Sequence, residues 1–461
     1  MLLKHEFHYI SLYLQEIYFM YSKDDFGDKF RWGVSLAAYQ VEGAYKDDGR
    51  GASIWDHFSN SKNRIEDGSN GNVACEFYYR YEQDIALAKS LNLTNFRFSI
   101  SWTRIVPDGT GEVNQLGLDF YNRLIDCCLK YDLEPWVTLY HWDLPQALEK
   151  QGGWTSRIVV NAFIKFVDVC SKSFGDRVKN WIVMNEPSTF TGLGYLIGYY
   201  APGRFGINNY LPAVHHATLC QAEGARMIRR NLPNAIIGTS ISCSYVAPSS
   251  DNPKQIAAAR RVDALLNRLH IEPILGMGYP VKDLPVLEQI EKYFHPYDEE
   301  LIKFDFDFIG IQNYFSLVAY NNPLIPYLQA FVVPFKKLNR PLTANGWEVH
   351  PEGMYRILKQ FSAYPIKELI VTENGAAFHD RVEDNCVHDK RRLQYIQSYL
   401  GEVLRAKQEG VNIGGYFVWT LMDNFEWRAG FRSRFGIVHT DFVHQTRIIK
   451  DSGLWIRDFL K

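Results

Sequence analysis

Eight short apolar runs alternate along this chain with longer amphipathic stretches, and this alternation limits the fold more than any other feature. The runs are rich in β-branched and aromatic residues and are bounded by turn-forming residues, which is typical of buried parallel strands. We predict strands at residues 31–36, 95–100, 135–141, 181–186, 235–240, 306–312, 368–373 and 413–420. Helical periodicity between them predicts helices at residues 76–91, 116–131, 156–174, 211–231, 351–361 and 389–407.

This pattern predicts an α/β fold with a single (β/α)8 barrel, a TIM barrel, over residues 24–461. Such barrels take about 250 residues and can exceed about 400 with insertions, and no Gly/Ser-rich linker divides the 461 residues of this chain. A doubly wound sheet is the alternative, but it needs a glycine-rich phosphate-binding turn after its first strand. Residues 37–43 read Ala-Ala-Tyr-Gln-Val-Glu-Gly instead, so the barrel is favoured.

The first 23 residues are expected to form an extension that precedes the barrel. The run from Phe7 to Tyr21 is apolar and aromatic, but Gln15 and Glu16 interrupt it, so it is too short and too polar to span a membrane. It also lacks the small-residue cleavage site of a secretory signal. We expect this extension to be dispensable for folding, with Met20 as an alternative start.

Charge and cysteine content narrow the class of protein. The net charge is −2 with both signs interspersed, which gives no electrostatic footprint for nucleic acid. The seven cysteines form no C-x-x-C pair and no Cys/His cluster with zinc spacing. Isolated thiols are typical of a reducing compartment. We therefore expect a cytoplasmic protein that takes no metal and binds neither nucleic acid nor a membrane.

Two glutamates stand at the ends of predicted strands four and seven. Glu186 is followed by Pro187, and Glu373 is followed by Asn-Gly, so each closes an apolar strand. Glutamate is rarely buried without a reason, and barrel enzymes carry their chemistry at the carboxyl ends of strands. We expect both carboxylates to project into one mouth of the barrel from opposite sides. A glycosidase needs such a pair, one to protonate the leaving oxygen and one to attack the sugar or activate water.

Polar or aromatic side chains also stand at or shortly after most of the other strand ends. Any single one is explained by structural hydrogen bonding. Together with the two glutamates, however, such groups stand at seven of the eight predicted strands, which packing alone does not explain. The candidates are Gln40, Arg97, His141, Gln312, Tyr314, Trp419, Glu426 and Trp427.

The motifs around these residues resemble those of glycoside hydrolase family 1, the β-glucosidase family of retaining β-glycosidases. The resemblance covers residues 30–460, and its motifs stand in the family order. They occupy residues 30–33, 38–43, 96–102, 138–145, 185–187, 372–375 and 419–427. A chance match to the Asn-Glu-Pro tripeptide alone would mean little, whereas seven motifs in one order are highly specific.

The resemblance implies a role for each candidate residue. It implies that Glu186 is the acid/base and Glu373 the nucleophile in the hydrolysis of terminal β-D-glycosyl residues, glucosides first and galactosides or fucosides next. Asn185 would hold the sugar 2-hydroxyl, while Arg97 and Tyr314 would hold Glu373 and keep it ionised. The implied substrate-binding residues are Gln40, His141, Gln312, Trp347, Trp419, Glu426 and Trp427. No cofactor is implied, and the expected partner is a small β-glycoside or oligosaccharide.

Two rival functions stay open. A 6-phospho-β-glycosidase would carry smaller residues in place of Glu426 and Trp427 and would add a Ser and a Lys for the phosphate. Glu426 instead places a carboxylate there, and like charges repel. A carbohydrate-binding barrel without catalysis usually lacks one of the two catalytic glutamates, and both are present here.

Overall fold

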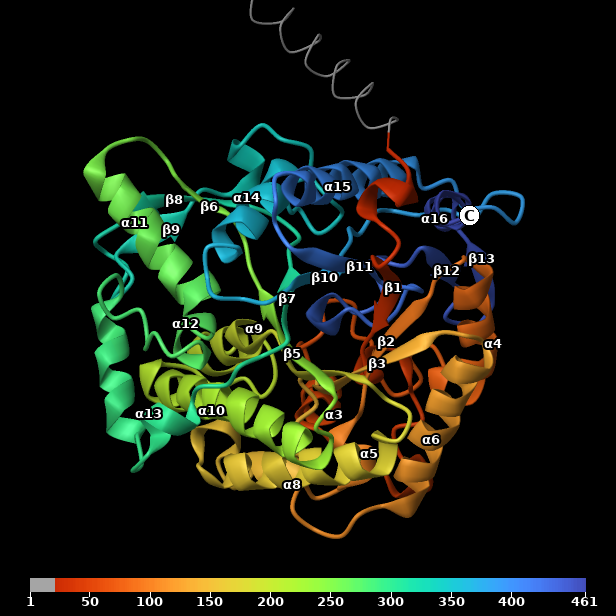
Figure 1. The fold of residues 1–461 in the computed structure, drawn as a ribbon, viewed down its shortest axis with the longest axis horizontal. Coiled ribbons are helices and arrows are strands. Elements are labelled where there is room, and N and C mark those ends of the chain that lie inside the picture. Colours follow the sequence, from red (N-terminus) through yellow and green to blue (C-terminus); the bar gives the residue numbers. More distant parts are fainter. Residues whose placement is uncertain (1–20) are drawn as a thin grey trace, which may run out of the picture.

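A closed barrel of eight parallel strands forms the centre of this computed structural model, which describes residues 21–461 (Figure 1). The strands are β1 (Arg31–Leu36), β2 (Asn95–Ser99), β3 (Glu134–Tyr140), β4 (Asn180–Asn185), β5 (Ile236–Ser242), β7 (Phe308–Gln312), β10 (Leu369–Asn374) and β11 (Ile413–Trp419). Their order around the barrel is β1-β11-β10-β7-β5-β4-β3-β2, so the first and last strands pair and close the sheet. The eight predicted strands and the (β/α)8 fold class are confirmed. The predicted extension falls largely on residues 1–20, outside the described residues.

Long helices connect successive strands and form the outer ring of the barrel (Figure 1). They are α4 (Phe77–Ser90), α6 (Gln115–Lys130), α8 (Ile158–Phe174), α10 (Ile207–Asn231), α11 (Pro253–Asp263), α14 (Glu352–Phe361), α15 (Lys390–Gln408) and α16 (Asp451–Phe459). The six predicted helices match α4, α6, α8, α10, α14 and α15 to within a few residues. In α14, for example, Met354, Ile357 and Phe361 recur at helical spacing and are fully buried, which is the apolar stripe that seats such a helix on the sheet.

Large side chains fill the inside of the barrel below the site. The ring of Trp136 meets the rings of Phe308 and Phe417 edge-on, with centroids 5.4 and 5.1 Å apart. Two glycines make room for these rings, because a Cβ atom at Gly33 would lie 2.4 Å from Phe417 and one at Gly238 would lie 2.4 Å from Phe308. The barrel is therefore packed on this side, and its opening lies at the carboxyl ends of the strands.

Smaller elements in the loops add to this framework, and the sequence analysis did not predict them. Strands β6 (Val246–Pro248), β8 (Leu317–Asn321) and β9 (Ala330–Val332) form one small sheet, and β12 (Val438–Thr440) pairs with β13 (Arg447–Ile449). The short α-helices are α2 (Ala38–Val41), α3 (Ile54–Ser59), α5 (Trp102–Ile105), α7 (Gln146–Glu149), α9 (Pro187–Thr191), α12 (Ile271–Ile274) and α13 (Asp298–Leu301). Short segments of 3-10 or π-helix are η1 (Lys23–Phe26), η2 (Asp47–Gly49), η3 (Gly153–Thr155), η4 (Gly192–Leu196), η5 (Ala264–Arg268), η6 (Pro285–Tyr293), η7 (Phe335–Lys337) and η8 (Trp427–Ala429).

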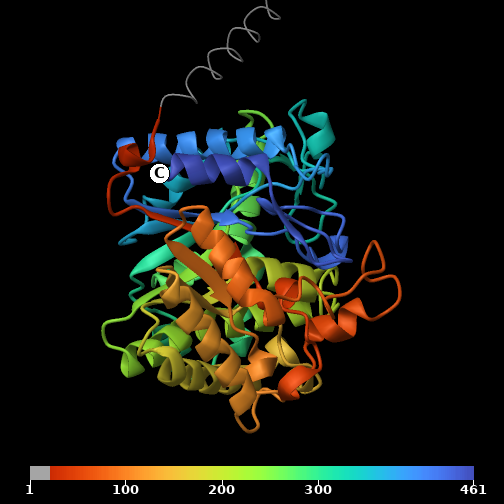
Figure 2. The same cartoon turned by 90° about the vertical axis from the view of Figure 1, so that its right-hand side faces the viewer.

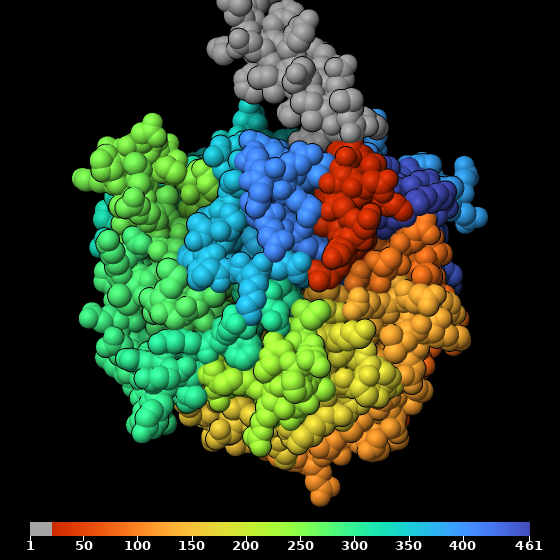
Figure 3. Space-filling view, in the orientation of Figure 1, coloured from red at the N-terminus to blue at the C-terminus, as the bar shows by residue number. Residues whose placement is uncertain are grey.

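The start of the described chain packs against its end. Helices α15 and α16 lie side by side (Figure 2), and the segment that begins at Tyr21 lies beside α15 (Figure 3). The hydroxyl of Tyr21 donates a hydrogen bond of 2.6 Å to the carbonyl of Gln397, and its ring meets that of Phe459 edge-on at 5.9 Å. Within residues 21–461, no helix has the length and apolarity to cross a membrane.

Candidate active site

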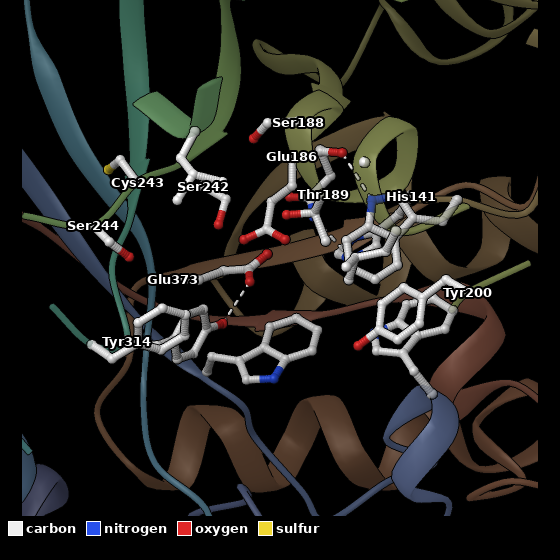
Figure 4. A pocket seen from close by; sticks show the side chains of 18 of the residues that line it. His141, Glu186, Ser188, Thr189, Tyr200, Ser242, Cys243, Ser244, Tyr314 and Glu373 are labelled. Carbon is white, nitrogen blue, oxygen red and sulfur yellow. Dashed lines mark hydrogen bonds between the residues drawn. The ribbon is translucent and has the colours of Figure 1, made fainter. Parts of the chain in front are cut away.

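A cavity of about 280 Å³ lies at the carboxyl ends of the barrel strands (Figure 4). Nine of the twelve predicted site residues line it, namely His141, Asn185, Glu186, Tyr314, Trp347, Glu373, Trp419, Glu426 and Trp427. The other three, Gln40, Arg97 and Gln312, stand behind the wall and bond to residues that line it. The structure therefore brings together residues that lie far apart in the sequence.

Glu373 lies near the end of β10 and is anchored through both of its oxygens. Nη1 of Arg97 donates to Oε1 at 2.5 Å, and the hydroxyl of Tyr314 donates to Oε2 at 2.7 Å. Burial raises the pKa of Glu373, while the charge of Arg97 and the hydrogen bonds from Tyr314 and Arg97 oppose that rise. These donors favour the ionised form and fix the direction in which the carboxylate faces the cavity.

Asn185 is the last residue of β4 and is held by side chains from three other strands or loops. Its Oδ1 accepts hydrogen bonds from Nη2 of Arg97 at 2.5 Å and from Nε2 of Gln312 at 2.7 Å. Its Nδ2 lies 3.1 Å from Nε2 of His141. Burial, with the nearby charge of Arg97, holds the pKa of His141 well below its usual value, so this ring is neutral at pH 7. Arg97 thus orients both Asn185 and Glu373.

Glu186 stands one residue beyond β4, at the start of α9. Its backbone is left-handed, with φ 46° and ψ 62°, which is uncommon for a residue other than glycine and recurs at functional sites. Figure 4 shows its carboxyl group facing that of Glu373 across the cavity, near Thr189 and Ser242. Burial raises the pKa of Glu186 to about 8, and the charge of Glu373 adds to that rise. Glu186 therefore carries a proton at neutral pH.

The two carboxyl groups enter the cavity from different parts of the barrel wall. Around the barrel, β4 and β10 are separated by β5 and β7 on the shorter side. Both groups reach the same cavity.

Gln40 and Glu426 form a polar end of the cavity. Nε2 of Gln40 donates to Oε2 of Glu426 at 3.1 Å and to Oδ1 of Asn424 at 3.1 Å. Burial raises the pKa of Glu426 to about 8, and the hydrogen bond from Gln40 opposes that rise. A carboxyl group held in this way presents both a donor and an acceptor, which suits a sugar hydroxyl.

Aromatic rings cover the remaining walls. The His141 ring stacks near Trp419 and Trp427, with centroids 5.8 and 6.0 Å away. Trp347 meets Tyr314 edge-on at 5.8 Å. Flat rings of this kind suit the C–H faces of a pyranose. Of the described residues, no group of three or more His, Cys, Asp or Glu side chains is arranged to hold a metal ion.

Several lining residues were missed by the sequence analysis. Strand β5 runs to Ser242, two residues past its predicted end, and Ser242, Cys243 and Ser244 line the cavity. The signal was present, since the Ser-Ile-Ser pattern continues the alternation of the strand. Trp142 and Tyr200 also line it, but they come from loops whose path is not readable from periodicity.

Comparisons with known proteins find similar chains over nearly the whole described length. The family model described as "Glycosyl hydrolase family 1" matches residues 22–461. β-Glucosidase A of Thermotoga maritima is 42% identical over 95% of this chain and 98% of its own length. β-Glucosidase A of Acetivibrio thermocellus is 40% identical over 95% of this chain and 99% of its own. A solved structure of the Thermotoga maritima family 1 glycoside hydrolase with a cyclophellitol-analogue transition state mimic superposes with a TM-score of 0.90, at 42% identity, over 94% of this chain and 97% of that chain.

Proposed function

This chain belongs to glycosyl hydrolase family 1, and we propose that Glu373 and Glu186 hydrolyse β-glycosides in its cavity by double displacement with retention of configuration. Its enzyme class is that of a β-glucosidase. The observation that carries the mechanism is the contrast between the two carboxyl groups. Glu373 is anchored by Arg97 and Tyr314, whereas Glu186 has a pKa of about 8 and keeps its proton.

In the first step, the ionised Glu373 attacks the anomeric carbon while Glu186 gives its proton to the leaving oxygen. The glycosidic C–O bond breaks, and the sugar becomes an ester of Glu373. Asn185, oriented by Arg97 and Gln312, holds the 2-hydroxyl, a contact that strengthens in the transition state.

In the second step, water replaces the enzyme at the anomeric carbon. The ester has removed the negative charge of Glu373, which was one cause of the raised pKa of Glu186. The pKa of Glu186 therefore falls, and its carboxylate takes a proton from the attacking water. The same carboxyl group is thus acid in one step and base in the next.

The lining of the cavity favours a neutral sugar. Among the described residues that line it, there is no lysine or arginine to pair with a phosphate. Glu426, bonded to Gln40, suits the hydroxyls of an unmodified glycone. This supports a β-glucoside over a 6-phospho-β-glucoside, and the presence of both glutamates supports catalysis over binding alone.

Proton NMR of the first-formed product tests the mechanism. A 4-nitrophenyl β-glucoside should release the β-anomer of glucose before mutarotation, because two inversions retain configuration. Release of the α-anomer would assign a single displacement and overturn the proposal. A panel of aryl β-glucosides, galactosides, fucosides and mannosides, run alongside, ranks the glycones.

The compartment and the extension are part of the same proposal. We place the enzyme in the cytoplasm, which is supported by seven cysteines that are all free, six of them buried. We also propose that residues 1–19 are dispensable for the barrel, because the described chain already closes through the pairing of β1 with β11.

A further inference from the structure

A second hollow lies outside the catalytic cavity, and we call it the outer cleft. Its volume is about 530 Å³. It adjoins the inner cavity, because Leu193, Tyr200, Phe315, Trp347 and Glu426 line both. The two hollows therefore adjoin, and the rings of Tyr200, Phe315 and Trp347 flank the passage between them.

Two arginines line the outer cleft, and their charges differ in how they are balanced. Arg432 forms an ion pair with Glu66. Within residues 21–461, Arg428 has no carboxylate partner, and its single side-chain hydrogen bond is a long one of 3.4 Å from Nη1 to the carbonyl of Tyr199. An arginine has five N–H donors, so most donors of Arg428 are unused. Its Nε is buried without a protein partner.

Local contacts hold Arg428 in place. Its guanidinium lies over the ring of Tyr199, 4.1 Å from the centroid. Its carbonyl accepts a hydrogen bond of 2.8 Å from the backbone N–H of Glu66. Further along the same loop, Ser433 donates to Oδ1 of Asn345 at 2.5 Å, which ties the loop to the opposite wall. The ring of Tyr199 and the anchored loop restrict the guanidinium, most of whose donors have no protein partner, and a restricted group binds with a smaller loss of entropy.

We propose that Arg428 binds a carboxylate on the leaving group, so that the preferred substrates are β-glycosides of aromatic hydroxy acids. This inference rests on the proposed function. A guanidinium matches the planar carboxylate with two parallel hydrogen bonds, and the rings of Tyr199, Tyr200 and Trp347 suit a flat aromatic body. When the glycosidic bond breaks, the proton from Glu186 leaves with the phenolic oxygen, and the product is the free hydroxy acid.

The test compares two glucosides that differ only in charge. They are the β-glucoside of 4-hydroxycinnamic acid and that of its primary carboxamide. The kcat/KM ratio of acid to amide should be about tenfold in the wild type and should fall toward one in Arg428→Gln, as expected when a hydrogen-bonded charge pair is lost. The ratio should also shrink in 1 M KCl, where the Debye length is only about 3 Å.

Arg432→Gln is the matched control, because it removes the same unit of charge from the same cleft. Its acid-to-amide ratio of kcat/KM should stay within about twofold of the wild-type ratio, since the charge of Arg432 is already paired with that of Glu66. Equal losses in both variants would indicate a general electrostatic effect and overturn the assignment to Arg428.

Calorimetric titration of the two glucosides into Glu373→Gln separates the inference from the proposed function. A wild-type enzyme that cleaves acid and amide equally well overturns the inference alone. A chain that cleaves neither but binds the acid about tenfold more tightly keeps the inference and overturns the proposed function.

Discussion

Arg97 and Glu373 form an ion pair of 2.5 Å between side chains that are only 1% and 4% exposed. The pair joins β2 to β10 across the barrel, and a second nitrogen of Arg97 binds Asn185. One guanidinium therefore orients both Glu373 and Asn185, the residues to which the proposed mechanism assigns the attack on the anomeric carbon and the contact with the 2-hydroxyl.

Replacement of the anchored carboxylate should stop turnover. We expect Glu373→Gly to lower kcat by at least about 10⁴-fold, because the covalent route is lost. Azide should restore activity on an activated aryl β-glucoside by entering the vacated space, and NMR should identify the α-glucosyl azide. In Glu186→Ala, azide should instead give the β-azide. The opposite pair of products would mean that the two roles are exchanged.

The pH profile of kcat/KM should be bell-shaped. Glu186 acts as an acid only while it is protonated, and its pKa is about 8, so activity should fall about tenfold per pH unit above that value. Glu373 acts only while it is ionised, and burial raises its pKa. The midpoint of the acid limb should therefore lie above the ordinary glutamate pKa of about 4.3.

Glu186→Gln provides the control for the basic limb. The substrate is 2,4-dinitrophenyl β-glucoside, whose leaving group needs no proton. The pH profile of kcat/KM for this variant should then have no basic limb. A basic limb of unchanged midpoint would assign the titration to another group, and Glu426, whose pKa is also about 8, would be the next to test.

Glu426 should select unphosphorylated sugars. The wild type should have a much higher kcat/KM for an aryl β-glucoside than for its 6-phosphate, because the inner cavity offers a carboxyl group and no cation. In Glu426→Gln, kcat/KM for the glucoside should fall roughly 10- to 100-fold, the cost of leaving a buried hydroxyl of the substrate without its hydrogen-bond partner. Steady-state kinetics with both substrates checks this, and a preference for the 6-phosphate would contradict it.

A chain that begins at Met20 should fold and act like the full chain. It keeps Tyr21, whose hydroxyl binds Gln397 and whose ring packs on Phe459. Thermal unfolding should show Tm unchanged within about one degree. A chain that begins at Ser22 is the matched comparison and should lose a few degrees, because it removes a packed aromatic residue. A large drop already at Met20 would show that residues 1–19 stabilise the barrel.

Lys450 should be a strong determinant of stability. Its ammonium is fully buried between Asp380 and Asp423, 2.5 and 2.7 Å from their carboxylates. Lys450→Met should lower the free energy of unfolding by about 3–5 kcal/mol, because it leaves two buried anions less compensated. Lys172→Met, which breaks an exposed pair with Asp168, should cost at most about 1 kcal/mol. Urea unfolding measures both.

The same ion cluster gives stability a defined pH dependence. Although burial acts to raise it, the charges of Lys450, Arg434 and Arg392 hold the pKa of Asp423 below its usual value. A carboxyl with a depressed folded pKa contributes stability above the unfolded value of about 3.9, and this contribution is lost as pH falls below that. The difference in free energy of unfolding between the wild type and Lys450→Met should therefore become smaller as the pH falls below about 3.9.

The barrel is predictable from the sequence because each strand is apolar, short and separated from the next by an amphipathic helix. Two strands show the limits of this reasoning. The predicted run at 181–186 includes Glu186, but the strand ends at Asn185 because Glu186 turns to a left-handed backbone. The predicted strand at 235–240 stops two residues before the end of β5, so Ser242 was not predicted as a site residue. The alternation of residues along a strand indicates which side chains are buried. It does not indicate where the pairing with the neighbouring strands ends.

The walls of the site are less predictable than its floor. Arg97, Asn185 and Glu373 stand on or at the ends of barrel strands, so their meeting follows from the topology. Tyr200 and Arg428 belong to loops after β4 and β11, and nothing in the local sequence indicates that Arg428 lies over Tyr199. The leaving-group side is built from such loops, and its chemistry therefore appears only in three dimensions.

The hydrogen bond between Gln40 and Glu426 has a consequence for biosynthesis. These residues are 386 positions apart, and Gln40 follows β1 whereas Glu426 follows β11, the strands whose pairing closes the barrel. A nascent chain that has emerged only as far as β10 already contains Glu186 and Glu373 but has no partner for Gln40, and the facing edges of β1 and β10 are still unpaired. The polar end of the cavity thus forms late in translation, when β11 and the loop that follows it leave the ribosome.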